Sequence, residues 1–301
     1  MNQDARISLP DSNHRRNRRR WLINSGCLAA AGLIGLSRKS RAADGKIRVG
    51  MTPAFLHDQH SLLDEWRAFM AASLKRPVEF VQRDSYRETM DLLRLEKLDF
   101  AWICDYPYLH LKQEVRLLAV PLYQGRPHYR SYLIVRKDNT KVSSMKDLSG
   151  SVFAYADPYS NTGYLAPRYE IRQSGHDPRS FFRKTFFTWS HRKVVEAVAS
   201  GLAHGGAVDS YIWETLAIVE PALPARTRVV SRSPEYGFPP FVSHRSVSPA
   251  DFQTMQQHLL DMARTDAGRR LLGRLHLDGF TVGSPALYDG VAQMMRAFGE
   301  A

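Results

Sequence analysis

Residues 152–173 read VFAYADPYSNTGYLAPRYEIRQ, a strand–turn–helix pattern from which the rest of the fold can be worked out. The apolar run 152–156 predicts a strand, and 163–173 has the periodicity of a helix. The polar turn Ser160-Asn161-Thr162-Gly163 lies between them. Pro167 places the helix start at this turn, because proline is tolerated in the first turn, where backbone N–H groups lack intrahelical partners. The turn is therefore predicted to form the N-terminal end of the helix.

The same alternation of short apolar runs and helical periods continues on both sides of this unit. Strands are predicted over 47–51, 78–82, 100–103, 117–123, 131–136, 185–189, 206–209 and, as an extended stretch, 227–233. Helices are predicted over 61–74, 86–97, 191–200, 211–219, 248–275 and 287–298, and a proline-rich segment covers 236–240. Alternating strands and helices indicate parallel sheets with helices on both faces, so the predicted class is α/β.

Two such α/β units, with the helical tail returning to the first, predict two lobes joined by two crossover strands. We assign residues 44–136 and 234–301 to lobe 1 and residues 137–233 to lobe 2. A cleft is expected where the carboxyl ends of the strands face each other, because open α/β sheets bind ligands there. Hinge closure around a ligand is the expected motion.

The charge of the chain is concentrated at its N-terminus. The 301 residues are 44% hydrophobic and 24% charged, as in ordinary soluble proteins, and carry a formal charge of +12. Residues 1–43 hold nine basic and two acidic side chains, which leaves +5 for residues 44–301. That mild excess is compatible with an anionic ligand, and no nucleic-acid partner is predicted.

Residues 1–43 have the features of an export signal. A basic cluster at 15–20 precedes a modestly apolar stretch at 21–36, and small residues follow. Arg18-Arg19-Arg20-Trp21-Leu22 resembles the twin-arginine export motif. The apolar stretch is too short and too polar for a membrane anchor, because a bilayer core is ~30 Å thick. We expect a twin-arginine signal peptide, cleavage near Ala42 or Ala43, and a periplasmic protein.

Cleavage would remove Cys27 and leave Cys104 as the single cysteine of the mature chain. One cysteine cannot form an internal disulfide, although the periplasm favours disulfides. Cys104 is therefore either a buried apolar filler or a thiol kept for binding. In the second case a nearby cation such as His191 would lower the pKa of the thiol.

Two helix starts in lobe 2 could hold an anion. At Ser160, Asn161 and Thr162, free backbone N–H groups, hydroxyls and the positive end of the helix dipole would form an anion cradle, although ordinary N-capping explains the same residues. His191 opens a second helix together with two further basic residues. An anion there would relieve their repulsion by the helix dipole, whereas a solvated basic turn would need none.

Further candidates lie at strand and helix ends. Tyr86 opens a helix, and Cys104 and Tyr108 follow a strand. The hydroxyl groups of the two tyrosines could donate to an oxyanion, or the rings could be ordinary half-buried aromatics. Asp209 ends a strand and could accept a hydrogen bond from a protonated oxyanion or cap the next helix. No catalytic, metal or cofactor motif is recognised, so none of these is predicted.

Several segments resemble one family when they are taken together in order. They are Tyr86 ahead of 95–99, 99–108, 131–135, 146–150, 160–163, Ser190-His191, 194–201, 207–210 and 238–240. The chain from about 46 to 288 resembles the substrate-binding proteins of phosphate, phosphite and phosphonate ABC transporters, a branch of the type II periplasmic binding fold. The resemblance implies that a small oxyanion is held by Tyr86, Tyr108, Ser160, Asn161, Thr162 and His191.

The resemblance also implies the partners. The expected function is capture of a small oxyanion of the phosphonate, phosphite or phosphate class and its delivery to a membrane ABC permease. Where many members have glycine, this chain has Cys104, as do similar periplasmic proteins that bind arsenite. An oxyanion sensor that signals to a histidine kinase is therefore an alternative. An enzyme on the same fold, with His191 and Asp209 as acid and base, is a further one.

Overall fold

The computed structural model describes residues 45–52 and 60–300 of the chain. The export signal predicted over residues 1–43 lies outside the described residues. The described residues all belong to one compact unit. Within the described ranges, no helix is both long enough and apolar enough to cross a membrane.

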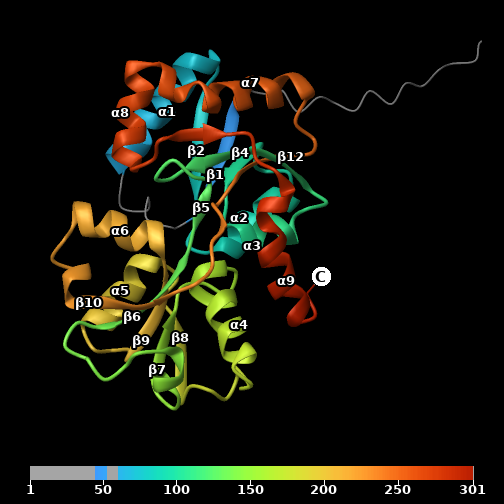
Figure 1. Ribbon diagram of the computed structural model, residues 1–301. Helices are drawn as coiled ribbons and strands as arrows, with labels where there is room; N and C mark the ends of the chain where they lie inside the picture. The colour runs from blue at the N-terminus through green and yellow to red at the C-terminus, as the bar shows by residue number, and fades with distance from the viewer. Residues whose placement is uncertain (1–44, 53–59, 301) are drawn as a thin grey trace, which may run out of the picture. The chain divides into compact units, whose positions relative to one another are not determined.

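The first of two main sheets has six strands in the order β13-β4-β12-β3-β1-β2 (Figure 1). The strands are β1 (Ile47–Met51), β2 (Val78–Gln82), β3 (Phe100–Trp102), β4 (Val115–Leu122), β12 (Phe241–His244) and β13 (Gly279–Thr281). β1 pairs in parallel with β2 and β3, whereas β12 runs antiparallel to β3 and β4. Its helices are α1 (His60–Leu74), α2 (Tyr86–Arg94), α3 (Asp105–His110), α7 (Pro249–Leu260), α8 (Asp266–Leu275) and α9 (Asp289–Ala297).

The second sheet has five strands in the order β10-β6-β9-β7-β8. They are β6 (Ser131–Arg136), β7 (Val152–Tyr155), β8 (Lys184–Phe187), β9 (Gly205–Asp209) and β10 (Thr227–Arg232). Its helices are α4 (Ala166–Gln173), α5 (His191–Ala199) and α6 (Ser210–Val219), with a π-helical turn at Asn161–Leu165 before α4. β7 pairs in parallel with β8 and β9, while β6 runs antiparallel to β9 and β10.

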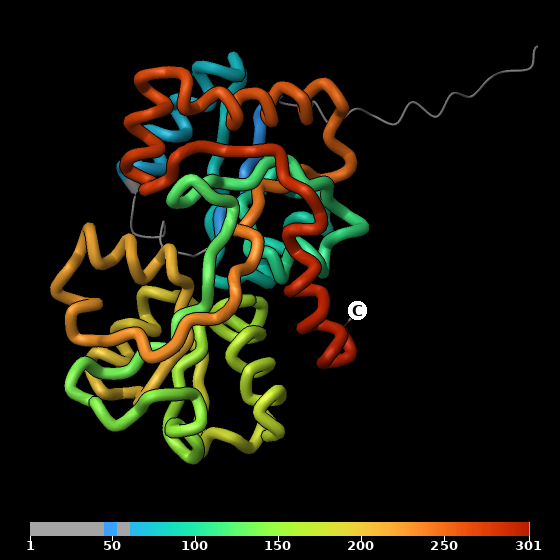
Figure 2. Tube along the Cα trace, viewed as in Figure 1, coloured from blue at the N-terminus to red at the C-terminus, as the bar shows by residue number. Residues whose placement is uncertain are grey.

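Two short strands connect the sheets, as expected for a pair of crossover strands. β5 (His128–Tyr129) and β11 (Tyr236–Gly237) pair antiparallel, and Figure 2 shows the two segments running side by side, in green and orange. The expected lobe boundary after residue 136 is wrong in one respect. β6 pairs with β9 and β10, so the chain enters the second sheet at Ser131, directly after β5. Tyr132 and Leu133 lie on opposite faces of β6 and both are buried. Burial of the strand on both faces explains its apolar sequence.

Aromatic side chains pack in the cores of both sheets, close to the strands that carry candidate residues. Trp66 of α1 is fully buried, and its ring meets Trp102 and Phe241 edge to face at centroid distances of 6.0 and 5.8 Å. In the second sheet Phe153 stacks on Phe182 at 4.3 Å. Such pairs contribute about 0.5–1.5 kcal/mol beyond area burial, so the strand ends that carry the candidate residues are held firmly.

Candidate functional site

A small inner cavity of about 30 Å³ lies where β1, β3 and the first turn of α6 meet. It is lined by Met51, Thr52, Tyr86, Trp102, Cys104, Asp209, Tyr211, Ile212, Phe238 and Pro239. Residues of both sheets contribute, so the cavity lies between strand carboxyl ends, as expected for this class of fold. Three predicted site residues, Tyr86, Cys104 and Asp209, are among those that line it.

Tyr86 reaches the cavity because it opens α2. Ser85 caps the helix by accepting a hydrogen bond from Glu88 N at 3.2 Å. The Tyr86 backbone N–H donates to Oδ2 of Asp157, which belongs to the second sheet's loop, at 3.1 Å. Within the described part of the chain the Tyr86 hydroxyl makes no hydrogen bond, although the residue is only 3% exposed. Burial raises its pKa well above the usual value, so the hydroxyl is a neutral, available donor.

Cys104 belongs to a buried polar cluster that joins the two sheets. Its Sγ donates to Oδ1 of Asp105 at 3.0 Å. Asp105 also accepts from the Tyr129 hydroxyl at 2.9 Å and from Asn161 Nδ2 at 2.8 Å. A fourth donor is the Tyr106 backbone N–H at 2.9 Å. One fully buried carboxylate therefore gathers donors from α3, from β5 and from the turn before α4.

The charges in this cluster differ from the sequence-based expectation for the thiol. Burial, and then the carboxylate of Asp105, raise the pKa of Cys104 well above its usual value. Burial raises the pKa of Asp105 itself to about 6, although its hydrogen bonds act in the opposite direction. The thiol is therefore protonated at neutral pH. The expected lowering of its pKa by a pocket cation is wrong, because burial and then the neighbouring carboxylate of Asp105 raise the pKa, and His191 is neutral.

The polar turn at Ser160 does form the N-terminal end of the helix. Ser160 is the N-cap, and its Oγ accepts from Gly163 N at 3.0 Å. The helix starts earlier than Pro167 suggested, with the π-helical turn at Asn161–Leu165. Pro167 is tolerated there because the nearby carbonyls have other donors. Ser131 Oγ donates to Thr162 O at 2.6 Å, and Ala156 N donates to Gly163 O at 3.2 Å.

Two buried polar atoms of this turn have no hydrogen-bond partner among the described residues. They are Oγ1 of Thr162 and Oδ1 of Asn161, and both residues are completely buried. The Asn161 amide is oriented by the bond from its Nδ2 to Asp105, so Oδ1 is the acceptor left over. An unpaired buried polar atom costs about 1–3 kcal/mol. The first turn of this helix therefore has unused hydrogen-bonding capacity.

His191 is buried as a neutral side chain. Its Nδ1 accepts from the Asp209 backbone N–H at 3.1 Å, so Nε2 carries the proton and lies 3.3 Å from Ser160 Oγ. Burial lowers the pKa of His191 to about 3. The imidazole thus connects Ser160, the N-cap of the turn before α4, to Asp209, which ends β9 and precedes α6. The expectation of three cations at this helix start is corrected to two, Arg192 and Lys193.

Asp209 performs the capping role that the sequence left open. Its Oδ1 accepts from Tyr211 N at 2.8 Å and from Ile212 N at 3.3 Å, at the start of α6. Burial raises the pKa of Asp209 to about 8, against the effect of these two hydrogen bonds. Because Asp209 also lines the cavity, capping and ligand binding remain compatible.

Tyr108 is the one predicted residue that the structure places apart from the others. Its ring packs against the ring of Tyr288 at a centroid distance of 4.9 Å. Burial raises the pKa of Tyr108, and the positive charge of Arg245 acts in the opposite direction. It lines neither the inner cavity nor the larger pocket described next. The side chain therefore stabilises the packing of α3.

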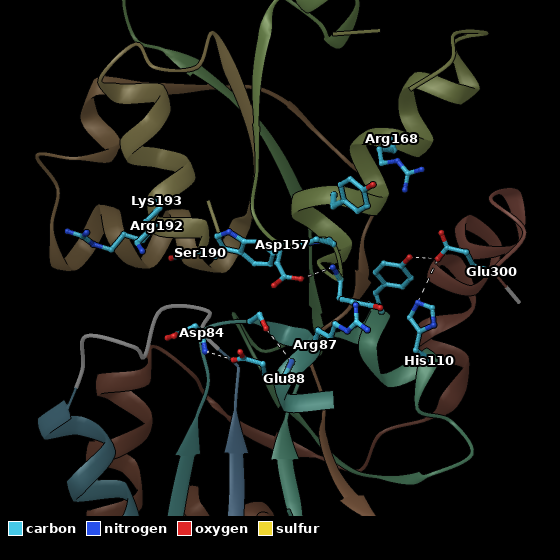
Figure 3. Close-up of a pocket in the computed structure, with 16 residues that line it drawn as sticks. Asp84, Arg87, Glu88, His110, Asp157, Arg168, Ser190, Arg192, Lys193 and Glu300 are labelled. Atoms are coloured by element: carbon cyan, nitrogen blue, oxygen red, sulfur yellow. Dashed lines mark hydrogen bonds and ion pairs between the residues drawn. The ribbon is translucent and has the colours of Figure 1, made fainter. Parts of the chain in front are cut away.

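A larger pocket of about 990 Å³ lies beside this cluster (Figure 3). Lys193 and Arg168 of the second sheet's helices and Arg87 of α2 line it, together with acidic residues that include Asp157 and Glu300. Figure 3 shows that these charges come from both sheets and from the C-terminal end of the chain. None of the predicted site residues is among the described residues that line this pocket, and its charges are of both signs, so it is a poorer candidate than the inner cavity.

Sequence reasoning missed two members of the buried cluster, Asp105 and Tyr129. The one available signal was an acidic residue directly after the apolar strand at 100–103, since a carboxylate there must be buried or at a cleft. Tyr129 gave no signal, because β5 is two residues long. Among the described residues, no group of three or more histidine, cysteine, aspartate or glutamate side chains could hold a metal ion.

Comparison with known proteins assigns the chain to a family. Residues 49–288 match the model of the periplasmic substrate-binding proteins of phosphonate ABC transporters. The chain belongs to this family. The match covers the inner cavity and the whole buried cluster, and the segments that suggested the resemblance lie within it or at its ends.

Individual relatives of this phosphonate-binding family are distant. The chain is 23% identical over 184 residues to the phosphate-import protein PhnD of Mycolicibacterium smegmatis, which covers 57% of each protein. It is 24% identical over 232 residues to the phosphonates-binding periplasmic protein of Escherichia coli K12, covering 72% of this chain and 67% of the relative. The chain thus spans little more than half the length of the first relative.

A solved structure confirms the fold. PhnD1 from Prochlorococcus marinus MIT 9301, in complex with methylphosphonate, superposes with a TM-score of 0.77 at 18% identity. The alignment covers 85% of this chain and 99% of PhnD1. The prediction of a type II periplasmic binding fold is therefore confirmed.

Proposed function

We propose that the chain is a periplasmic solute-binding protein that captures a small oxyanion of the phosphonate, phosphite or phosphate class for an ABC permease. The inner cavity between the two sheets carries this proposal, because it is small and the polar side chains of Tyr86 and Asp209 line it among apolar residues. Among the described residues, the Tyr86 hydroxyl that borders the cavity makes no hydrogen bond, and Thr162, which does not itself line the cavity, has a second unpaired hydroxyl in the turn before α4. Oxyanion binding by hydroxyls and a helix N-terminus fits this arrangement.

Family membership supports transport rather than the alternatives. The matched family consists of transporter binding proteins, and both relatives above carry import or periplasmic-binding names. None of these comparisons supports a histidine-kinase sensor. An enzyme using His191 as a base is disfavoured, because both ring nitrogens are engaged and the pKa of His191 is far below neutrality. Export through the twin-arginine route is part of the proposal.

A melting assay tests oxyanion capture. The mature protein would be screened with phosphate, phosphite, methylphosphonate, arsenite, arsenate, sulfate and selenite. A ligand at a hundredfold excess over Kd stabilises the folded state by about 2.7 kcal/mol. For a domain of this size, that is a rise in Tm of roughly 5–11 °C. A flat profile with folded, ligand-free protein would refute the proposal.

Thr162→Val sharpens the test. The ligand-free variant should be as stable as the wild type or more so, because a buried hydroxyl without a partner is removed. Its affinity should fall roughly 10- to 150-fold if the lost bond was to a charged group. Thr215→Val is the matched control. Thr215 Oγ1 is also buried without a partner among the described residues, but Thr215 lies in the second turn of α6 and does not line the inner cavity. Equal affinity losses in both variants would contradict the role of Thr162.

A further inference from the structure

One oxygen of Asp209 has no protein partner. Oδ1 accepts both capping hydrogen bonds of α6, whereas no hydrogen bond to Oδ2 is found in the described part of the chain. The residue is 5% exposed and lines the inner cavity. A carboxylate oxygen that is buried at a cavity must be satisfied by water, by a proton or by the ligand.

The surroundings of Asp209 supply no positive charge. Among the described residues that line the cavity there is no lysine, arginine or histidine. His191 contacts the Asp209 backbone as a neutral imidazole. Asp105 and Glu214 are the charged groups that act on Asp209, and both are acidic. The remaining titratable neighbours are neutral side chains, namely Tyr86, Cys104, Tyr129 and Tyr211.

An unprotonated oxyanion would therefore meet an acceptor where it needs a donor. Two oxygens that both accept repel each other unless a proton lies between them. Burial raises the pKa of Asp209 to about 8, so the buried carboxyl favours its protonated form at neutral pH. The proton can come from Asp209 or from the ligand, and both routes give the same bound state.

Resting on the proposed function, we propose that the site takes its oxyanion together with one proton, shared between a ligand oxygen and Oδ2 of Asp209. The bond that forms is a hydrogen bond from the protonated partner to the unprotonated one. The ligand class is thus an oxyanion that binds as a proton–anion pair. Binding should weaken as pH rises above about 8, because free protein and free ligand have then both lost the proton.

Calorimetry with methylphosphonate at pH 9, in two buffers of different ionisation enthalpy, measures the proton directly. The wild type should take up close to one proton for each ligand bound, and its affinity should fall up to tenfold per pH unit above this range. Asp209→Asn should take up none and show no such slope, because the amide keeps the capping oxygen and presents a permanent N–H donor. Asp157→Asn is the control, since both oxygens of Asp157 already accept hydrogen bonds.

The outcomes separate this inference from the proposed function. Binding of methylphosphonate without proton uptake by the wild type would overturn the inference and leave the function intact. The same pH slope in Asp209→Asn as in the wild type would also overturn it. Failure of methylphosphonate and of every other anion in the panel to bind at pH 7 would overturn the proposed function, and this inference with it. Loss of proton uptake in Asp157→Asn as well as in Asp209→Asn would show that Asp209 is not the specific site.

Discussion

Replacing Tyr129 by phenylalanine should destabilise the protein more at pH 8 than at pH 5. The Tyr129 hydroxyl donates to Oδ1 of Asp105 at 2.9 Å inside the fully buried cluster. Burial raises the pKa of Asp105 from 3.8 to about 6. The folded state therefore binds the proton more tightly than the unfolded state, and the stability associated with Asp105 falls as pH rises from about 4 to 6.

The magnitude follows from the charge state of the acceptor. At pH 8 Asp105 is ionised, and a hydrogen bond to a charged group contributes about 1.5–3 kcal/mol. At pH 5 it is mostly protonated, and a bond between neutral groups contributes about 0.5–1.5 kcal/mol. The loss in Tyr129→Phe should thus be about 1 kcal/mol larger at pH 8. For a domain of this size, 1 kcal/mol corresponds to roughly 2–4 °C in Tm.

Denaturant unfolding at both pH values, on wild type and variant, measures the difference. Tyr236→Phe is the matched control, because Tyr236 packs against the Tyr129 ring and its hydrogen-bond partners, the Met294 sulfur at 3.6 Å and the Ser233 side chain, are both uncharged. The control should lose little, and equally at both pH values. Equal losses for Tyr129→Phe at pH 5 and pH 8 would refute the assignment of a charged, hydrogen-bonded Asp105.

Three further predictions concern other parts of the chain. Replacing both Arg18 and Arg19 by lysine should leave the precursor in the cytoplasm, as cell fractionation would show; normal periplasmic accumulation would remove the twin-arginine assignment. Burial lowers the pKa of His191 to about 3, so the unfolded state takes up a proton first on acidification. Between pH 7 and pH 4.5 the wild type should therefore lose about 2–3 kcal/mol more than His191→Gln in denaturant unfolding, and parallel losses would be inconsistent with a buried neutral imidazole. Cys104→Ser, compared with wild type by calorimetry, should lose arsenite binding if the thiol touches the ligand, because thiolates prefer soft centres. Unchanged phosphite binding in both proteins, with no arsenite binding in either, would identify Cys104 as a packing residue.

Much of the fold could be predicted because buried strands appear as apolar runs between polar turns. β1, β2 and β6 have the predicted bounds. β12 was missed because it is four residues long and follows two prolines, which indicated a loop. α3 was missed because it has six residues and contains Pro107. Short elements of this kind depend on their neighbours in the sheet rather than on their own sequence.

The site was predictable only as a set of residue types at strand and helix ends. Tyr86, Cys104 and Asp209 were found because each follows or opens a recognisable element. The contact of Asp105 with Asn161 joins residues 56 positions apart, so no local pattern contains it. The protonation of Cys104 and the neutrality of His191 follow from burial and from one acidic neighbour, which sequence alone does not give. Tyr108 looked equivalent to Tyr86 but turns toward Tyr288.

A crystal structure of the mature protein with the panel anion that gives the largest rise in Tm tests oxyanion capture most directly. The account predicts density for the anion in the inner cavity, with its oxygens within hydrogen-bonding distance of the Tyr86 hydroxyl, Thr162 Oγ1 and Asp209 Oδ2. Density in the larger pocket beside Arg168 and Lys193, with the inner cavity unchanged, would contradict it.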